Sequence, residues 1–342
     1  MTDSDYLFKI IKNLQVSSAM FKKTFLLFLS LSLILPFAGA EAAQKKAHRV
    51  GAKHEQVRKH VVSARHKHKL EKASNSVDPF KESYTSAGEP KLASAKALVM
   101  DQATGEILYG KNIDKPTPIA SVTKLMTAMV MLDAHLPMDE TLAVTEADVD
   151  KLKGSSSKLP VGSELTRQEL LHMALMSSEN RAASALCRNY PGGETAFVAA
   201  MNAKANALGM HDSHFVDPTG LNSNNVSTAI DLAKMVRAAY NYPQIRQVST
   251  SPSQEFNLNS YRRPVNFSNT NLLVRNSNSK WVIGLSKTGY ISEAGRCLVM
   301  QAEISGKGVV LVFLDSMGKL SRIGDAERIR KWMEHNGSGR IG

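Results

Sequence analysis

Short hydrophobic runs of strand type occur in two groups, one near residue 100 and one near residue 300, with helical patterns between them. The first group predicts a hairpin, because two apolar runs flank the turn signal Gln-Ala-Thr-Gly at 102–105. The second group consists of three longer runs. We therefore predict five strands, which cover Ala95–Asp101, Glu106–Tyr109, Trp281–Tyr290, Arg296–Ile304 and Gly308–Leu314.

Apolar residues at helical spacing, together with helix end signals, predict helices between the two strand groups and after the second. Thr166-Arg167-Gln168-Glu169 has the pattern of a capping box, and Gly209 has the place of a C-cap. The predicted helices cover Ile119–Leu136, a segment that begins at Thr166, Thr195–Leu208, a segment from Ser227 or Thr228 to Tyr240, and Ser321–His335.

The order of these elements is strand pair, helices, strand triplet and helix, which predicts an α+β fold. Two strand groups bury their apolar faces when they combine into one sheet covered by helices. We expect one antiparallel sheet of about five strands, formed by both ends of the domain and flanked by helices, with a helical lobe inserted. The folded domain is expected at residues 93–336, with a flexible C-terminus at 337–342.

An export signal is predicted at the start of the chain. Lys22 and Lys23 precede the apolar run Thr24–Phe37, and Ala38-Gly39-Ala40 follows it. This is the order of a secretory signal peptide, so residues 1–40 are expected to be cleaved from an exported protein. A membrane anchor is the alternative, but the run is shorter than the about 20 apolar residues of a spanning helix.

Most of the positive charge lies in one His-rich segment. Residues 41–72 hold ten Lys or Arg against three Glu, a net +7 of the chain's +12, and five of its ten His. A His-rich tract can bind metal, but the irregular spacing and the cationic neighbours disfavour this. We expect a solvated tail that contacts anionic wall or membrane surfaces, with a linker up to residue 92. Aromatic residues make up only 6% of the chain and form no stacking platform, so no nucleic-acid binding is expected.

Cys187 and Cys297 are the two cysteines of the chain. They could form a disulfide in an oxidising compartment. Two small buried side chains are the favoured alternative, because nothing in the sequence indicates that they lie close together. No paired Cys/His ligand spacing occurs, so we predict no metal site and no cofactor.

Ser121 and Lys124 are the first candidates for chemistry. Residues three apart lie on one side of a helix, with about 5–6 Å between their Cβ atoms. A serine needs a base to attack an amide, and a lysine can serve when burial or nearby cations lower its pKa. At a helix start, the helix dipole would also favour developing negative charge. Alone, the same spacing occurs at ordinary helix starts.

Ser178-Glu179-Asn180 form a second polar group, after an apolar helical pattern. A hydroxyl and an amide at that place could pass a proton and hold a substrate carbonyl. A polar turn that ends a helix is the simpler alternative for this motif taken alone.

Lys287-Thr288-Gly289 interrupt the third apolar strand. A cation and a hydroxyl on one strand edge suit a substrate carboxylate, and Gly289 permits a ligand to approach the backbone closely. The N–H of Tyr290 could pair with that of Ser121 as an oxyanion hole.

The ordered combination of S-x-x-K, S-x-N and K-T-G is specific where each motif alone is not. It is the signature of penicillin-binding proteins and class A β-lactamases. Residues 93–316 resemble the low-molecular-mass penicillin-binding proteins, the peptidase S11 family of DD-carboxypeptidases and DD-endopeptidases, in which Asp217-Pro218-Thr219-Gly220-Leu221 is also typical. The segments SSENRAASALC and KTGYISEAGRCLVMQ look closest to the penicillin-binding protein seven type, the DD-endopeptidases.

The resemblance implies a β-lactamase/transpeptidase-like fold and a role for each motif residue. Ser121 would form the acyl-enzyme, with Lys124 as its proton acceptor. Ser178 and Asn180 would form the second wall of the cleft, and Ser178 would relay a proton to the leaving amine.

The same resemblance implies the substrate. Lys287 and Thr288 would hold the carboxylate beside the scissile bond of peptidoglycan peptides. The expected activity is cleavage of D-alanyl–diaminopimelate cross-links in the periplasm during wall remodelling, with β-lactam antibiotics as covalent inhibitors.

Three alternatives are left open. A carboxypeptidase that releases terminal D-alanine from pentapeptides needs the same groups. A β-lactamase needs in addition a Glu that activates the deacylating water; Glu179 is the middle residue of S-x-N, and Glu164 and Glu169 lie upstream, where such a base is not expected. A non-catalytic wall-binding protein is disfavoured because every motif side chain is present.

Overall fold

The computed structural model describes residues 84, 85 and 88–338. All of them belong to the second of two compact units into which the chain divides, Ser76–Gly342. The predicted signal peptide at 1–40 and the predicted basic tail at 41–72 lie outside the described residues. No helix in the described part of the chain is long and apolar enough to cross a membrane.

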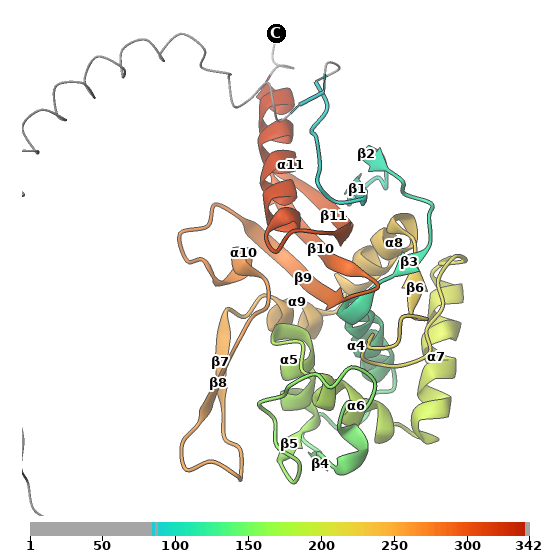
Figure 1. The fold of residues 1–342 in the computed structure, drawn as a ribbon, viewed down its shortest axis with the longest axis vertical. Coiled ribbons are helices and arrows are strands. Elements are labelled where there is room, and N and C mark those ends of the chain that lie inside the picture. The colour runs from blue at the N-terminus through green and yellow to red at the C-terminus, as the bar shows by residue number, and fades with distance from the viewer. Residues whose placement is uncertain (1–83, 86–87, 339–342) are drawn as a thin grey trace, which may run out of the picture. The chain divides into compact units, whose positions relative to one another are not determined.

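A five-stranded antiparallel sheet joins the two ends of the domain (Figure 1), as the sequence predicts. β1 (Lys96–Asp101) and β2 (Ile107–Lys111) come from the start, and β9 (Val282–Ile291), β10 (Gly295–Ile304) and β11 (Lys307–Ser316) come from the end. The strand order is β2-β1-β11-β10-β9, so β11 pairs with β1 across the whole domain. This order leaves β9 at one edge, beside the helical lobe.

Both faces of the sheet are covered by helices, which explains why its strands are almost continuously apolar. In β11, Val309, Leu311 and Phe313 pack toward α11 (Ser321–Ser338), and the alternate residues pack toward the helical lobe. α8 (Ala229–Ala239) covers that second face (Figure 1). Each fully buried Val or Leu contributes about 1.5–3 kcal/mol to folding.

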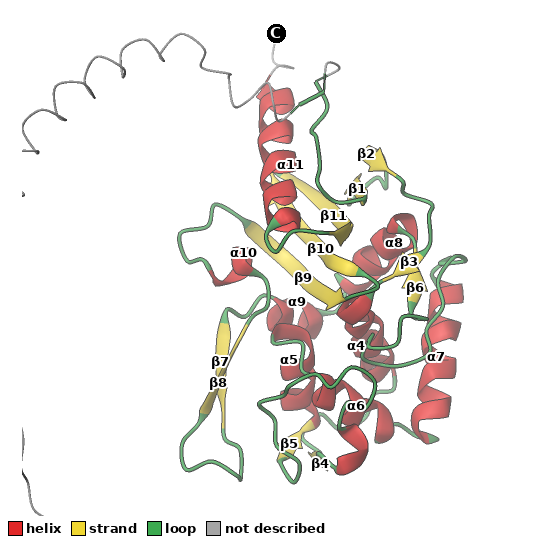
Figure 2. Cartoon of the chain, in the orientation of Figure 1, coloured by secondary structure: helices red, strands yellow, loops and turns green. Residues whose placement is uncertain are grey.

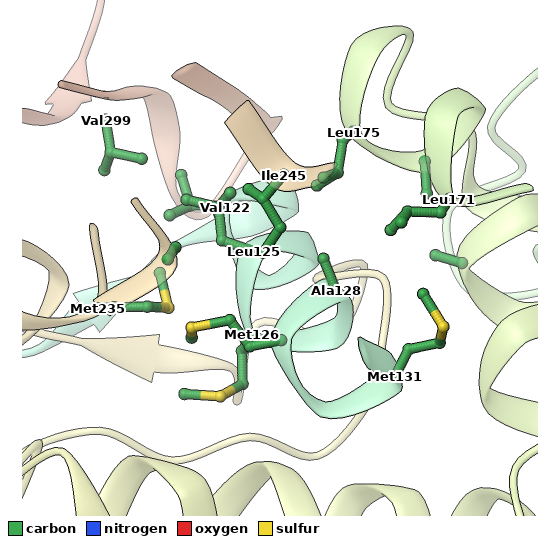
Figure 3. Close-up of a cluster of buried hydrophobic side chains, with 14 of the residues drawn as sticks. Val122, Leu125, Met126, Ala128, Met131, Leu171, Leu175, Met235, Ile245 and Val299 are labelled. Atoms are coloured by element: carbon green, nitrogen blue, oxygen red, sulfur yellow. The ribbon is translucent and has the colours of Figure 1, made fainter. Parts of the chain in front are cut away.

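The centre of the helical lobe is α4 (Lys124–Asp133), whose residues 124–131 are all buried. A helix that is apolar all round belongs inside a protein. Figure 3 shows side chains of α4 beside those of α5, α8 and α9. The sheet residue labelled there is Val299 of β10. The lobe also contains α5 (Arg167–Met176), α6 (Asn180–Arg188), α7 (Gly193–Ala207) and α9 (Pro243–Ser249).

The helix ends follow the sequence signals closely. The capping box at the start of α5 is confirmed, with Thr166 and Glu169 in both reciprocal contacts. Thr228, one of the two expected caps, accepts a hydrogen bond from Asp231 N at the start of α8. The first predicted helix is shorter than expected, because it begins as a 3-10 turn and ends at Asp133.

Several short elements complete the fold (Figure 2) and were not predicted. These strands and helices are too short to show a hydrophobic periodicity in the sequence. They are β3 (Thr117–Pro118) with β6 (Val226–Ser227), β4 (Thr141–Ala143) with β5 (Glu164–Thr166), β7 (Ser253–Phe256) with β8 (Val265–Ser268), α10 (Leu272–Arg275) and the 3-10 helix η2 (Glu146–Asp148). The 3-10 turn at the start of the first predicted helix is η1 (Ala120–Thr123). Cys187 and Cys297 are both buried and unbonded, as the favoured alternative predicts.

Candidate active site

Ser121 and Lys124 lie where η1 becomes α4. Ala120, just before the serine, has a positive φ of 48°, an uncommon conformation for a residue with a side chain. The amine of Lys124 lies 2.8 Å from Ser121 Oγ. The expected contact between the two residues three apart is therefore confirmed, on a short 3-10 turn rather than on a regular helix.

The amine of Lys124 is completely buried and has three oxygen partners. Besides Ser121 Oγ, it donates to Asn180 Oδ1 at 2.7 Å and to the carbonyl oxygen of Thr219 at 2.8 Å. Both of these oxygens can only accept hydrogen bonds. If the amine is neutral, they take its two N–H groups, and its lone pair is left facing the Ser121 hydroxyl.

Burial lowers the pKa of the Lys124 amine to about 7, because an ammonium group loses its water shell inside the protein. Carboxylates act against this effect and raise the pKa: those of Asp217, Glu179 and Asp150. A large fraction of the amine is therefore uncharged near neutral pH. An uncharged lysine in contact with a serine hydroxyl has the properties of a general base.

The turn at Asp217–Leu221 fixes the backbone before the nucleophile. Asp217 Oδ1 accepts hydrogen bonds from the amides of Thr219, at 2.6 Å, and Gly220, at 2.7 Å. Gly220 has a φ of 79°, and a Cβ at this position would lie 1.9 Å from the carbonyl oxygen of Ala120. Only glycine fits this contact. The turn also brings the Thr219 carbonyl to the buried amine.

Ser178 and Asn180 lie at the break between α5 and α6. α5 ends at Met176, α6 begins at Asn180, and Ser178 between them has a φ of 64°. This strained turn directs Asn180 to Lys124 and lets Ser178 Oγ accept a hydrogen bond of 2.8 Å from Lys287 Nζ. The motif is thus both a helix break and a wall of the site.

Glu179 lies on the far side of the same break. Its Oε2 accepts a hydrogen bond of 2.7 Å from Ser157 Oγ, and its Oε1 one of 3.3 Å from Lys158 N. Burial raises the pKa of Glu179, and these hydrogen bonds lower it by less. Glu169 accepts a hydrogen bond from Thr166 N in the capping box of α5, and Glu164 is exposed in β5. These three carboxyl groups lie outside the cleft that contains Ser121.

Lys287 and Thr288 come from β9, the strand beside the helical lobe. Lys287 Nζ also donates to the carbonyl of Thr288 at 2.9 Å, and Thr288 Oγ1 donates to Thr270 Oγ1 at 2.6 Å. Burial lowers the pKa of the Lys287 amine well below its ordinary value, and the charge of Lys124 lowers it further. The charged form of Lys287 is therefore disfavoured both by burial and by the charge of Lys124.

Gly289 lets β9 run directly against η1. A Cβ at Gly289 would lie 2.9 Å from the carbonyl oxygen of Ile119 and 3.1 Å from Ser121 N. The next residue, Tyr290, is 57% exposed, and the guanidinium of Arg296 lies over one face of its ring, 4.3 Å from the ring centroid. An oxyanion hole made by the amides of Ser121 and Tyr290 stays a prediction, supported by this close approach.

One cleft between the sheet and the helical lobe collects the motif residues. Lys124 and Lys287 are buried beneath the cleft surface, where their amines are in hydrogen-bond contact with Ser121 and Ser178, two of the residues that line it. Among the described residues that line the cleft, three are cationic and none carries a carboxylate, so the cleft suits an anionic substrate group. The lining residues are Ser121, Lys153, Ser155, Ser178, Asn180, Leu221, Thr270, Thr288, Gly289, Tyr290, Ile291, Ser292, Arg296 and Arg322.

Arg322 is a site residue that the sequence analysis missed. It lies in the first turn of α11 and is only 9% exposed, and its Nε has no hydrogen-bond partner in the described structure. Burial lowers the pKa of its guanidinium, and the neighbouring charge of Arg296 lowers it further. A signal existed in the sequence, because Arg322 falls on the same face of the helix as the buried Ala326 and Ile329.

A serine beside a buried amine with a lowered pKa, at the edge of an electropositive cleft, defines the class of serine-type acyl-transfer hydrolases. The model of the peptidase S11 family, described as D-alanyl-D-alanine carboxypeptidase, matches residues 83–318. The chain belongs to this family.

Relatives of established name agree with this assignment. The chain is 49% identical over 246 residues to the D-alanyl-D-alanine endopeptidase of Pseudomonas aeruginosa, a match that covers 72% of this chain and 79% of that protein. It is 47% identical over 250 residues to the D-alanyl-D-alanine endopeptidase of Escherichia coli, covering 73% and 80%.

A solved structure shows the same fold. The crystal structure of the Streptomyces K15 DD-transpeptidase matches with a TM-score of 0.65 and 30% sequence identity, over 71% of this chain and 97% of that chain. The expected transpeptidase-like α+β fold is therefore confirmed.

Proposed function

We propose that this protein is a periplasmic DD-endopeptidase that opens D-alanyl–diaminopimelate cross-links of peptidoglycan through an acyl-enzyme on Ser121. The observation that carries the proposal is the contact of 2.8 Å between Ser121 Oγ and the fully buried amine of Lys124. The endopeptidase names of the relatives at 49% and 47% identity support this activity over the carboxypeptidases, which match at 28–32%.

Acylation follows from the donors and acceptors of the site. The neutral amine of Lys124 takes the proton of Ser121 as Oγ attacks the carbonyl carbon of the D-alanyl residue. The amides of Ser121 and Tyr290 stabilise the negative charge on the carbonyl oxygen. As the C–N bond breaks, Ser178 Oγ relays to the leaving amine the proton that Lys124 took from Ser121, so both side chains return to their starting forms. The Asn180 side chain holds the substrate backbone.

The carboxylate beside the scissile bond is bound at the cationic end of the cleft. Lys287 and Thr288 supply a cation and a hydroxyl on β9, and Arg322 adds a buried guanidinium whose Nε is free to donate. A guanidinium matches a carboxylate with two parallel hydrogen bonds. We include Arg322 among the substrate-binding residues for this reason.

Slow deacylation explains the proposed inhibition by β-lactam antibiotics. Within the described part of the cleft, no carboxylate is available to activate a water molecule against the acyl-enzyme. After peptide cleavage the amine product departs, and a water molecule can take its place beside the neutral amine of Lys124 and hydrolyse the acyl-enzyme. An opened β-lactam keeps its amine attached and blocks that place, so a penicillin that acylates Ser121 would stay bound. This favours a penicillin-binding peptidase over a β-lactamase.

The proposed roles of the signal peptide and of the basic tail rest on the sequence alone. Residues 1–40 would direct the chain to the periplasm, and residues 41–72 would attach it to anionic wall or membrane surfaces. Deleting residues 41–72 should abolish binding to isolated sacculi at low salt, and that binding should weaken with added salt in the undeleted protein.

The choice between endopeptidase and carboxypeptidase is tested with two purified wall peptides. A cross-linked dimer and a monomeric pentapeptide are incubated with the protein, and the products are separated by mass. We expect monomers from the dimer, slower release of D-alanine from the pentapeptide, and neither product with Ser121→Ala. Release of D-alanine with intact dimer would assign a carboxypeptidase instead.

A further inference from the structure

The loop that follows η2 reaches the catalytic base through one serine. Asn180 donates a hydrogen bond from Nδ2 to Ser155 Oγ at 2.9 Å, while its Oδ1 accepts from Lys124 Nζ at 2.7 Å. Ser155 is itself held by Asp150, whose Oδ2 accepts from Ser155 N at 2.8 Å. These contacts form a continuous chain from Asp150 to the amine that faces Ser121.

The hydrogen bond to Ser155 fixes which way the amide of Asn180 points, and Asp150 holds the backbone of the loop that carries Ser155. Burial raises the pKa of the Asp150 carboxyl, and hydrogen bonds, first of all from the Ser155 side chain, lower it below its ordinary value. Ser155 Oγ accepts the hydrogen bond from Asn180 Nδ2, so it meets the amide with a lone pair. Lone pairs attract the NH₂ end of the amide, so the carbonyl end is turned to Lys124.

We infer that Ser155 is a positioning residue for the reaction, which acts by fixing the side-chain amide of Asn180 against Lys124. Without this bond the amide is free to rotate, and its NH₂ group can face the lysine. An NH₂ group in that place competes with the N–H groups of the amine and removes one of the two acceptors that orient its lone pair to Ser121. The inference rests on the proposed function, because it concerns the acylation of Ser121.

Hydrogen bonds to Asp150 and an ion pair of Lys153 hold the loop that carries Ser155 in place. Asp150 Oδ1 accepts hydrogen bonds from the amides of Leu152, at 2.8 Å, and Lys153, at 3.0 Å, so the turn that leads to Ser155 is closed upon one carboxylate. Lys153 also forms an ion pair with Glu293 in the β9–β10 turn, on the opposite wall of the cleft. The loop is therefore held from both lobes.

The test is the rate of acylation by a penicillin, followed by intact mass at several drug concentrations. Ser155→Ala should lower the limiting acylation rate constant about 5- to 20-fold, the effect of one lost hydrogen bond at the reacting centre, with little change in the half-saturating concentration. Ser155→Thr, which keeps the hydroxyl, should stay within about threefold of the wild type. Ser251→Ala, whose hydroxyl bonds only to a backbone carbonyl away from the cleft, is the matched control.

A double-mutant cycle separates positioning from a general structural effect. If Ser155 acts only through Asn180, Ser155→Ala combined with Asn180→Ala should be no slower than Asn180→Ala alone. Losses that multiply in the double variant, or a Ser155→Ala rate equal to that of the wild type, would overturn the inference. Wild-type protein that forms no adduct would instead contradict the proposed function, so the two failures are distinguishable.

Discussion

Lys287 and Ser178 join the two lobes across the candidate active site, through a hydrogen bond of 2.8 Å between Nζ and Oγ. Lys287 is buried, and no described carboxylate forms an ion pair with it. A buried amine without a carboxylate partner costs folding free energy. We explain its position by the serine that it holds and by the substrate carboxylate that we propose it binds.

Lys287→Met should separate stability from activity. The side chain keeps its length but loses its desolvation cost, so we expect the free energy of unfolding at pH 6 to rise by about 1 kcal/mol. The rate of peptide cleavage should fall at least about 10-fold, because hydrogen bonds to Ser178 and to the substrate are lost. Urea unfolding and steady-state assays measure the two effects. A less stable but fully active variant would contradict the assigned position.

The pH dependence of acylation should follow the amine of Lys124. Its pKa is lowered by burial to about 7, and only the neutral form accepts a proton. The acylation rate should therefore rise about tenfold per pH unit below 7 and level off above it. The measurement is the rate of penicillin adduct formation between pH 5 and 9. A rate that continues to rise toward pH 10 would mean an ordinary, solvated lysine.

The charges that face Lys124 provide a sharper form of this test. Asp150, Glu179 and Asp217 raise its pKa, and the amine of Lys287 is the nearby basic group. Glu179→Gln removes one carboxylate, so the midpoint of the profile should move to lower pH. The exposed Glu164→Gln serves as the matched control and should leave the midpoint unchanged.

Gly220→Ala should damage the site through the backbone. The added Cβ would lie 1.9 Å from the carbonyl oxygen of Ala120, at a φ of 79°, so the chain before Ser121 must move. We expect a loss of about 3 kcal/mol or more in the free energy of unfolding, together with loss of acylation. Gly162→Ala has a similar φ of 84° and free space around the new atom. It should lose only about 1 kcal/mol, and equal losses in both variants would contradict the role of the contact with Ala120.

The ion pair between Lys153 and Glu293 links the two walls of the cleft at the surface. The hydrogen bond from Lys153 lowers the pKa of Glu293 to about 2, yet both side chains are partly exposed to solvent and salt. Lys153→Glu should raise the KM for a cross-linked peptide about two- to fivefold at low salt. The double variant that combines Lys153→Glu with Glu293→Lys exchanges the two charges and should restore the wild-type KM. Lys151→Ala, on the same loop, is the control. A KM of the double variant as high as that of Lys153→Glu alone would exclude a direct charge contact.

Much of the fold follows from short-range patterns. The runs that predict β9, β10 and β11 are long and apolar because both faces of the sheet are covered, and the caps at Thr166 and Thr228 mark helix starts through their own hydrogen bonds. The short hairpin of β7 and β8 was missed. Its eight residues include only three apolar ones, Phe256, Val265 and Phe267, and they give no readable period.

The site was predicted where its residues are neighbours in sequence. Ser121 and Lys124 are three apart, and their contact could be foreseen. The positive φ of Ala120 and Ser178 could not, because neither residue favours that conformation, and tertiary contacts such as that of Gly220 impose it. Ser155 reaches the cleft through the packing of distant segments, which no local pattern reveals. Arg322 could have been found, because it has helical spacing with the buried Ala326 and Ile329.

The central claim is that Ser121 forms an acyl-enzyme with Lys124 as its base. The most direct measurement is the intact mass of residues 41–342 during incubation with a penicillin, followed by mapping of the modified peptide. We predict a long-lived adduct on Ser121 in the wild type, none in Ser121→Ala, and a greatly slowed adduct in Lys124→Met. An adduct that persists in folded Ser121→Ala protein, or penicillin consumed with no adduct accumulating, would contradict the account.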